Sequence, residues 1–224
     1  MQTLIKDIRY GVRILLRSPG FAAVALLAIT LGIGVNTTIF SALDATLFHP
    51  FAFANEQRLV MVWERNPDLG YSRGSVAPAN FKDWREQNQS LDDLVGIKNR
   101  YFDLTEGGQP ERFFGYETTA GFFDALGVKA LYGRTFRPED GQPGSTHVVV
   151  LKNTLWQRRF GADPNVVGQP LTLNRESFTV IGVMPEDFNY PFNGGEMWAP
   201  LVLDPQMTID RSSHYMQAMG LLKD

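Results

Sequence analysis

Cysteine is absent from this chain of 224 residues, and histidine occurs only three times. Without cysteine the protein has neither disulfide bonds nor a thiol nucleophile, which is compatible with a bacterial periplasm but not specific to it. His49, His147 and His214 are far apart in the sequence and lack neighbours at the spacing of metal ligands. We therefore expect no metal site, and no sequence feature requires a cofactor.

The sequence also lacks the common catalytic and nucleotide-binding motifs. It contains no H-E-x-x-H, no Walker A loop and no G-x-G-x-x-G after a strand. One run, Gly70-Tyr71-Ser72-Arg73-Gly74, fits the G-x-S-x-G nucleophile elbow, in which a strand leads into a strained turn and a helix follows. Here a turn-forming segment precedes Ser72 and a polar loop follows it. We therefore expect no catalytic residues and a protein that is not an enzyme.

Adjacent acidic residues occur at three places: Asp92-Asp93, Glu139-Asp140 and Glu186-Asp187. Each pair stands beside turn residues or proline, which is typical of solvated loop charges and helix caps. Acid–base pairs or a cation site are the alternative interpretation.

A long uncharged segment is the most informative feature that is present. Residues 18–43 contain no charged side chain. About 20 apolar residues are enough for a helix to cross the hydrocarbon core of a bilayer, so we predict a transmembrane helix over residues 19–43. A cleaved signal peptide is the alternative, but its apolar region is usually about 7 to 15 residues long, and no convincing A-x-A site follows here.

Charge on the two sides of this segment predicts its orientation. The first 17 residues have four basic residues and one acidic residue, whereas residues 44–224 have 17 basic and 23 acidic residues. Because basic flanks stay in the cytoplasm, we expect a cytoplasmic N-terminus, an anchor in the bacterial inner membrane and a periplasmic domain over residues 44–224. The acidity of that domain argues against nucleic acid as a partner.

The basic head, residues 1–18, has a pattern of its own. Six apolar residues between Leu4 and Leu16 recur at helical spacing, and the basic side chains Lys6, Arg9, Arg13 and Arg17 occupy the other side. This pattern predicts an amphipathic helix in the membrane interface that could contact a cytoplasmic partner. A basic tail that only sets topology is the alternative.

Within the predicted membrane helix, Ala28, Gly32 and Asn36 are spaced four residues apart. Small residues allow helices to approach closely, and an amide that faces lipid would be unfavourable. We therefore predict that these three residues form a face that packs against other helices. Glycine and alanine are common in any transmembrane helix, so a chance pattern is the alternative.

The remaining residues predict a mixed domain of the α+β class. We expect helices over residues 78–89, 119–126 and 153–160, the last capped by Asn153, and strands over residues 59–63 and 147–151. Two hairpins are expected, one joining 101–104 to 111–117 and one joining 171–173 to 178–183 around residues 174–177. Phe188, Tyr190, Phe192 and Trp198 form a late aromatic group that we interpret as core, with a contact surface as the alternative.

Several phrases resemble a known family. In the first 41 residues these are Asp7-Ile8-Arg9-Tyr10-Gly11-Val12-Arg13, Ser18-Pro19-Gly20-Phe21 and the run from Leu31 to Ser41. Later phrases are Phe122-Phe123-x-x-Leu126-Gly127, Gly133-Arg134-x-Phe136, the run from Trp156 to Gly168, and Phe178 to Pro185. Together they resemble the MacB/FtsX-type ABC transporter permeases with a MacB-like periplasmic core domain, especially the acidobacterial duplicated orphan permeases.

This resemblance implies a permease-type subunit in which a separate cytoplasmic ABC ATPase domain or subunit hydrolyses ATP and membrane helices relay movement to periplasmic domains. It implies other permease helices or subunits as membrane partners, and an unidentified periplasmic protein partner. For the orphan subgroup the energy source and the cargo stay open. Members of the family continue into further periplasmic segments and at least three more helices, whereas this sequence stops at Asp224. We therefore expect a truncated chain with an incomplete periplasmic domain.

Three functions remain open on the sequence. The first is a permease-type subunit or its remnant. The second is a single-pass anchored periplasmic module that binds a partner without ATPase coupling. The third is a membrane-tethered enzyme, for which Ser72 is the only sequence support.

Overall fold

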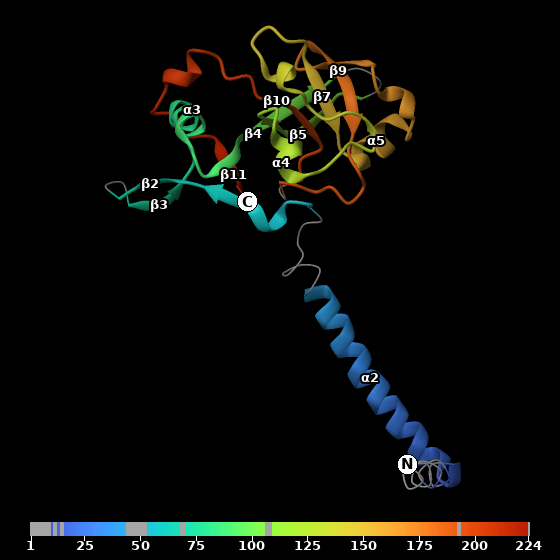
Figure 1. Cartoon of the computed structure of the whole chain (residues 1–224). Helices are drawn as coiled ribbons and strands as arrows, with labels where there is room; N and C mark the ends of the chain where they lie inside the picture. Colours follow the sequence, from blue (N-terminus) through green and yellow to red (C-terminus); the bar gives the residue numbers. More distant parts are fainter. Residues whose placement is uncertain are drawn as a thin grey trace. The chain divides into compact units, whose positions relative to one another are not determined.

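The computed structural model describes residues 10, 13, 16–43, 53–67, 70–105, 109–191 and 194–223. The chain divides into two compact units, Met1–Phe51 and Ala52–Asp224. The first contains a long apolar helix, and the second, called the core domain below, is rich in β-structure (Figure 1). The predicted order of an N-terminal apolar helix followed by a mixed α+β domain is confirmed.

Helix α2 spans Pro19–Leu43. It begins at a proline, which the first turn of a helix tolerates because the missing N–H has no partner there. Its stretch Pro19–Ser41 has a mean hydropathy of 2.0 and is long and apolar enough to cross a membrane. Leu27 and Leu31 are about 70% exposed, so this apolar surface needs lipid or other helices to cover it.

The basic head is described only in part. Arg13 and Arg17 are helical and exposed, and Ser18 separates the helical residues 16–17 from α2. Lys6, Arg9 and most of the apolar stripe lie outside the described residues. The interfacial helix therefore stays a prediction.

One mixed sheet forms the centre of the core domain (Figure 1). Its order is β1-β11-β4-β5-β10-β7-β9-β6, and β8 pairs with both β4 and β9. The β5–β10 and β7–β9 pairs are parallel, and the other pairs are antiparallel. The strands are β1 Leu59–Val62, β4 Leu91–Leu104, β5 Glu111–Thr118, β6 Tyr132–Gly133, β7 Val148–Leu151, β8 Pro170–Leu173, β9 Glu176–Val183, β10 Met197–Pro200 and β11 Gln217–Leu222.

Short helices and a small hairpin surround this sheet. Strands β2 (Glu64–Asn66) and β3 (Tyr71–Gly74) form a separate antiparallel pair. The helices are α3 (Pro78–Gln87), α4 (Phe122–Leu126) and α5 (Asn153–Phe160), with 3-10 turns η2 Glu56–Arg58, η3 Pro138–Gly141, η4 Pro164–Val166 and η5 Met207–Ile209. Helices α4 and α5 end at Gly127 and Gly161, which have φ of 69° and 61°. Glycine adopts this left-handed conformation without steric cost and so stops each helix.

Apolar side chains cover both faces of the sheet. On β10, Trp198 joins a cluster with Phe122 and Phe123 of α4, whereas its neighbours Met197 and Ala199 join a cluster with Leu155 and Trp156 of α5. Because successive residues of a strand point to opposite faces, these clusters lie on opposite sides of the sheet. A third cluster lies beneath α3 and includes Val76, Phe81, Leu94 and Met216.

Most of the predicted elements are present, with corrections at their ends. Strand β4 begins at Leu91 rather than at Tyr101. Lys152, not Asn153, is the N-cap of α5; Asn153 is the first helical residue, and its amide oxygen accepts a hydrogen bond from Gln157. The β8–β9 turn needs only Asn174 and Arg175, because both adopt positive φ (53° and 68°) and reverse the chain in two residues.

The aromatic group late in the sequence is core where it is described. Phe188 and Trp198 are 3% and 1% exposed, and Tyr190 packs against the same cluster. Burial raises the pKa of the Tyr190 phenol. Phe192 lies outside the described residues.

Candidate functional site

The structure places Ser72 in a setting unlike a nucleophile elbow. Ser72 lies within β3, which pairs with β2 in the small hairpin, and its side chain is exposed. The elbow needs the serine on a strained turn between a strand and a helix. The position of Ser72 therefore removes the structural basis for the one catalytic motif in the sequence.

Two of the three acidic pairs, Asp92-Asp93 and Glu139-Asp140, make separate local contacts. Asp92 is paired with Arg58, and Asp93 lies 3.8 Å from Arg85. Burial raises the pKa of the Asp93 carboxyl. Glu186 and Asp187 are exposed in the turn before Phe188. Across the residues that the structure describes, no group of three or more histidine or acidic side chains could hold a metal ion.

Asp140 has the most complete set of contacts among these acids. Its carboxylate accepts hydrogen bonds from Arg134 Nη1 (2.6 Å), from Arg134 Nη2 (3.0 Å) and from the Arg137 backbone N–H (2.7 Å). Burial by itself raises the pKa of Asp140, but these hydrogen bonds outweigh it and hold that pKa below its usual value. The contacts fasten the 3-10 turn η3 to the segment after β6.

We expect Asp140→Asn to lower the free energy of unfolding by about 1–3 kcal/mol at pH 7, because charge-assisted hydrogen bonds are lost. The folded-state pKa lies below the unfolded value of about 3.9. The stabilisation is therefore complete above the unfolded-state pKa and is lost as the pH falls through the folded-state pKa. The melting temperatures of the unmodified chain and of Asp140→Asn should differ at pH 7 and converge in acid. Asp187→Asn should have little effect on the melting temperature. A difference that is independent of pH would contradict this account.

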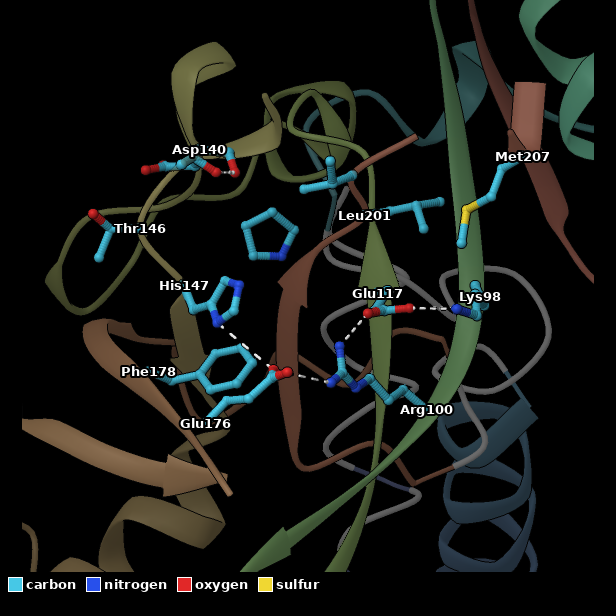
Figure 2. A pocket seen from close by; sticks show the side chains of 13 residues that line it. Lys98, Arg100, Glu117, Asp140, Thr146, His147, Glu176, Phe178, Leu201 and Met207 are labelled. Atoms are coloured by element: carbon cyan, nitrogen blue, oxygen red, sulfur yellow. Dashed lines mark hydrogen bonds and ion pairs between the residues drawn. The ribbon is translucent and has the colours of Figure 1, made fainter. Parts of the chain in front are cut away.

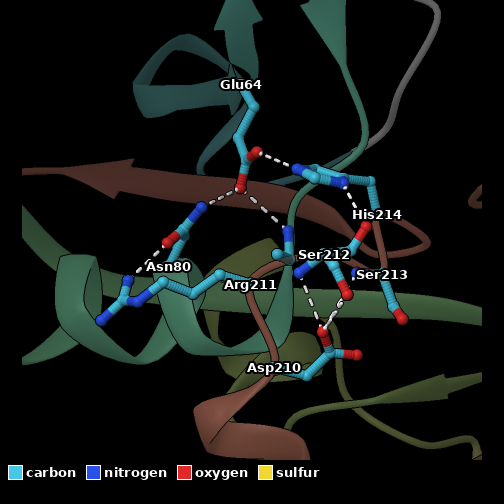
Figure 3. A network of polar contacts seen from close by, with 8 residues as sticks. Glu64, Asn80, Asp210, Arg211, Ser212, Ser213 and His214 are labelled. Carbon is cyan, nitrogen blue, oxygen red and sulfur yellow. Dashed lines mark hydrogen bonds and ion pairs between the residues drawn. The ribbon is translucent and has the colours of Figure 1, made fainter.

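His214 belongs to a polar network that holds the segment before β11 (Figure 3). Glu64 Oε1 accepts hydrogen bonds from the Ala77 backbone N–H (2.9 Å) and from Asn80 Nδ2 (2.8 Å), while Glu64 Oε2 lies 2.8 Å from His214 Nε2. Asp210 accepts hydrogen bonds from Ser212 and Ser213, which lower its pKa. This network ties β2, the start of α3 and residues 210–214 together, so its role is structural.

The predicted helix-packing face lies on the exposed surface of α2. Ala28, Gly32 and Asn36 are all exposed, and a Cβ added at Gly32 would meet nothing within 4 Å. A different face of α2 is hollowed around Gly34, and Thr38 Oγ1 donates a hydrogen bond to the Gly34 carbonyl (2.8 Å). The helix therefore offers two small-residue faces, and sequence reasoning identified only one of them.

A cavity of about 160 Å³ is lined by residues of β4, β5, β9 and β10 and by the segment before β7 (Figure 2). Strands β4 and β5 contribute Lys98, Arg100 and Glu117. Glu117 is mostly buried; Lys98 Nζ lies 2.8 Å from its Oε2 atom, and Arg100 pairs with its Oε1 atom. The other walls are Asp140, Ser145, Thr146, His147, Glu176, Phe178, Pro200, Leu201, Val202 and Met207.

Sequence reasoning did not identify this cavity. In the sequence His147 is an isolated histidine, and His49, the third histidine, lies outside the described residues. Lys98 and Arg100 alternate on one strand and so share a face, which is the only sequence signal that could have indicated a charged site here.

Comparisons with known proteins agree with this fold. The sequence profile of the MacB-like periplasmic core domain matches residues 22–224. No curated protein sequence matches the chain. Among solved structures, a domain of a permease protein from Porphyromonas gingivalis is 17% identical, with a TM-score of 0.57 over 76% of this chain and 77% of that one.

Two further solved structures come from transporters. The periplasmic region of MacB from Actinobacillus actinomycetemcomitans is 18% identical, with a TM-score of 0.50 over 74% of each chain. The extracellular domain of the noncanonic ABC-type transporter YknZ from Gram-positive bacteria is 12% identical, with a TM-score of 0.50 over 74% of this chain and 82% of that one. At these identities the likeness shows a shared fold. Because the family profile matches nearly the whole chain, this protein belongs to the family defined by the MacB-like periplasmic core domain.

Proposed function

We propose that this chain is a non-catalytic, permease-type subunit of a MacB/FtsX-like ABC transporter. One observation carries the proposal: a helix long and apolar enough to span a membrane precedes a MacB-like core domain in the same chain. The solved relatives of the core domain come from a permease and from ABC-type transporters. A fold alone does not determine function, so the membrane helix is an essential part of the argument.

In this proposal α2 anchors the chain in the inner membrane, with the basic head in the cytoplasm and the core domain in the periplasm. Only residues 44–52 separate α2 from the first described residue of the core domain. A short connection favours transmission of helix movement to the attached domain. A cytoplasmic ABC ATPase, other permease helices and a periplasmic protein are the partners that this role requires. Assignment to the acidobacterial orphan subgroup rests on the sequence phrases alone.

The alternative function is a single-pass anchored module that binds a periplasmic partner without ATPase coupling. In the described part of the chain, α2 is the one helix that meets the requirements for a membrane span. A single helix is sufficient for an anchor, whereas a permease needs a bundle of helices. The two functions therefore differ in whether α2 makes specific contacts in the membrane.

Gly32→Leu tests those contacts. If Ala28, Gly32 and Asn36 pack against partner helices, a leucine at position 32 should abolish the detergent-stable complex, because its side chain prevents close helix approach. The measurement is co-purification of membrane partners with the tagged chain.

Gly34→Leu is the matched control, because Gly34 lies on another face of α2 and both glycines have open space around them in this chain. We expect the complex to survive Gly34→Leu. Loss of the complex with Gly34→Leu alone would indicate that α2 packs through the hollow around Gly34 instead. Survival of the complex in both variants would contradict packing through either face of α2.

A further inference from the structure

The cavity in Figure 2 contains an arginine with unused hydrogen-bonding capacity. Arg100 Nη1 is paired with Glu117. Among the described residues, Arg100 Nη2 has Glu176 Oε2 as its acidic partner, at a distance of 4.0 Å. This distance is too long for a hydrogen bond. One side of the guanidinium therefore faces Glu176 across the cavity without a close acceptor.

His147 approaches the same glutamate oxygen. Its Nδ1 atom lies 3.6 Å from Glu176 Oε2, again beyond hydrogen-bond distance. The imidazole packs against the Phe178 ring with centroids 5.0 Å apart, which orients it toward the cavity as Figure 2 shows. Glu176 itself is 53% exposed. It is a loosely held counter-ion between two nitrogen groups rather than a tightly bonded partner.

The charges of the cavity lining balance only when Glu176 is counted. Lys98 and Arg100 both pair with the buried carboxylate of Glu117. Asp140 is occupied by its two hydrogen bonds from Arg134. One positive charge is therefore in excess at the cavity floor, and the exposed Glu176 is the lining residue left to balance it.

Apolar side chains form the rest of the walls. Phe178, Leu201, Val202 and Met207 line the cavity beside the charged groups. The Arg100 guanidinium also lies over the Phe102 and Phe178 rings, at 5.2 Å and 5.8 Å from their centroids, and these contacts help to fix its position. The volume of about 160 Å³ accommodates a small acid but not a large substrate.

We propose that this cavity binds a carboxylate on a short apolar stem, which displaces Glu176 and takes its place between Arg100 Nη2 and His147. The carboxylate accepts hydrogen bonds from both groups, and its stem packs against Phe178 and Leu201. The ligand is either a free organic acid or an acidic side chain of a partner protein. This proposal goes beyond the permease role and does not depend on it.

Ligand-observed NMR with the full chain in detergent micelles tests the site. Butyrate tests whether a free acid binds, and butyramide is its uncharged control. The peptide acetyl-Ala-Glu-Ala-amide probes the side-chain source, with acetyl-Ala-Gln-Ala-amide as its match. We expect binding of at least one carboxylate and no binding of the uncharged matches. Binding of butyrate supports a free acid, and binding of the peptide alone supports a partner side chain.

Two variants give opposite expected effects. Glu176→Gln removes the internal competitor, so the carboxylate should bind about three- to fivefold more tightly. Arg100→Gln should weaken binding at least tenfold, because a charged hydrogen-bond donor to the carboxylate is lost. Arg112→Gln, which removes an exposed arginine that pairs with Asp103 outside the cavity, is the control and should leave binding unchanged.

The proposal is overturned if no carboxylate binds the unmodified chain, or if Glu176→Gln binds no more tightly than that chain does. Arg100→Gln leaves the buried Glu117 with Lys98 alone and can impair folding. In that case Glu176→Gln decides the matter, because Glu176 is exposed and its replacement leaves the core intact.

Discussion

Phe123→Ala is expected to lower the free energy of unfolding of the core domain by about 3–5 kcal/mol. The Phe123 side chain is fully buried. Its ring centroid lies 5.2 Å from Phe136, 5.8 Å from Phe188 and 6.1 Å from Trp198. Truncation to alanine leaves a cavity among these rings and removes their aromatic contacts. Since whole domains are stable by only about 5–15 kcal/mol, the loss is a large share of the total.

Urea unfolding of the full chain in detergent, followed by tryptophan fluorescence, measures this effect. Tyr101→Ala is the matched control, because Tyr101 is an aromatic residue on the same sheet but is 61% exposed. Tyr101→Ala should lower the free energy of unfolding by about 1 kcal/mol or less, mainly because the ring contact with Phe114 is lost. Equal effects of the two substitutions would contradict the position of Phe123 at the centre of the α4-side cluster.

Removal of residues 1–51 is expected to transfer the protein from the membrane fraction to the soluble fraction. Helix α2 has 25 residues and, at about 1.5 Å per residue, is roughly 37 Å long, which exceeds the hydrocarbon thickness of about 30 Å. Its apolar side chains are exposed. The core domain buries its own apolar clusters on both faces of its sheet.

Fractionation with an alkaline carbonate wash measures this transfer. The full chain should stay in the membrane pellet, and the chain from Ala52 to Asp224 should appear in the supernatant. Release of the full chain by the wash would contradict anchoring by α2. Retention of the shortened chain would mean that the core domain itself binds the membrane.

The sequence predicted those elements whose ends are marked by local chemistry. Pro78 begins α3, and Gly127 and Gly161 end α4 and α5, because these residues restrict or release backbone angles without help from distant contacts. The start of β4 was missed because Asp92, Asp93 and Gly96 interrupt the apolar alternation there. Pairing with β11, more than 100 residues away in the sequence, keeps that part extended.

Strand β10 illustrates the same limit. It is short and follows Gly194 and Gly195, so the local sequence indicates a turn rather than a central strand. Its partners are β5 on one side and β7 on the other, and both are distant in the sequence. Tertiary pairing therefore determines the middle of the sheet, and single-sequence patterns do not contain that information.

The cavity could not be predicted for a related reason. Arg100, Glu117, His147 and Glu176 come from four different strands or their starts, and no local motif joins them. His147 lacks ligand-like neighbours in sequence, yet the pairing of β7 with β9 brings it near Glu176. The predicted face of Ala28, Gly32 and Asn36 follows from helical spacing alone. That face stays a prediction until the contact is measured.

The most direct test of the permease role is crosslinking of the tagged chain in a bacterial membrane, followed by mass spectrometry of what is recovered. The account predicts recovery of an ABC ATPase or of a multi-helix permease in crosslinks that include α2. Recovery of the chain only with itself, or only with periplasmic proteins through the core domain, would contradict the permease role.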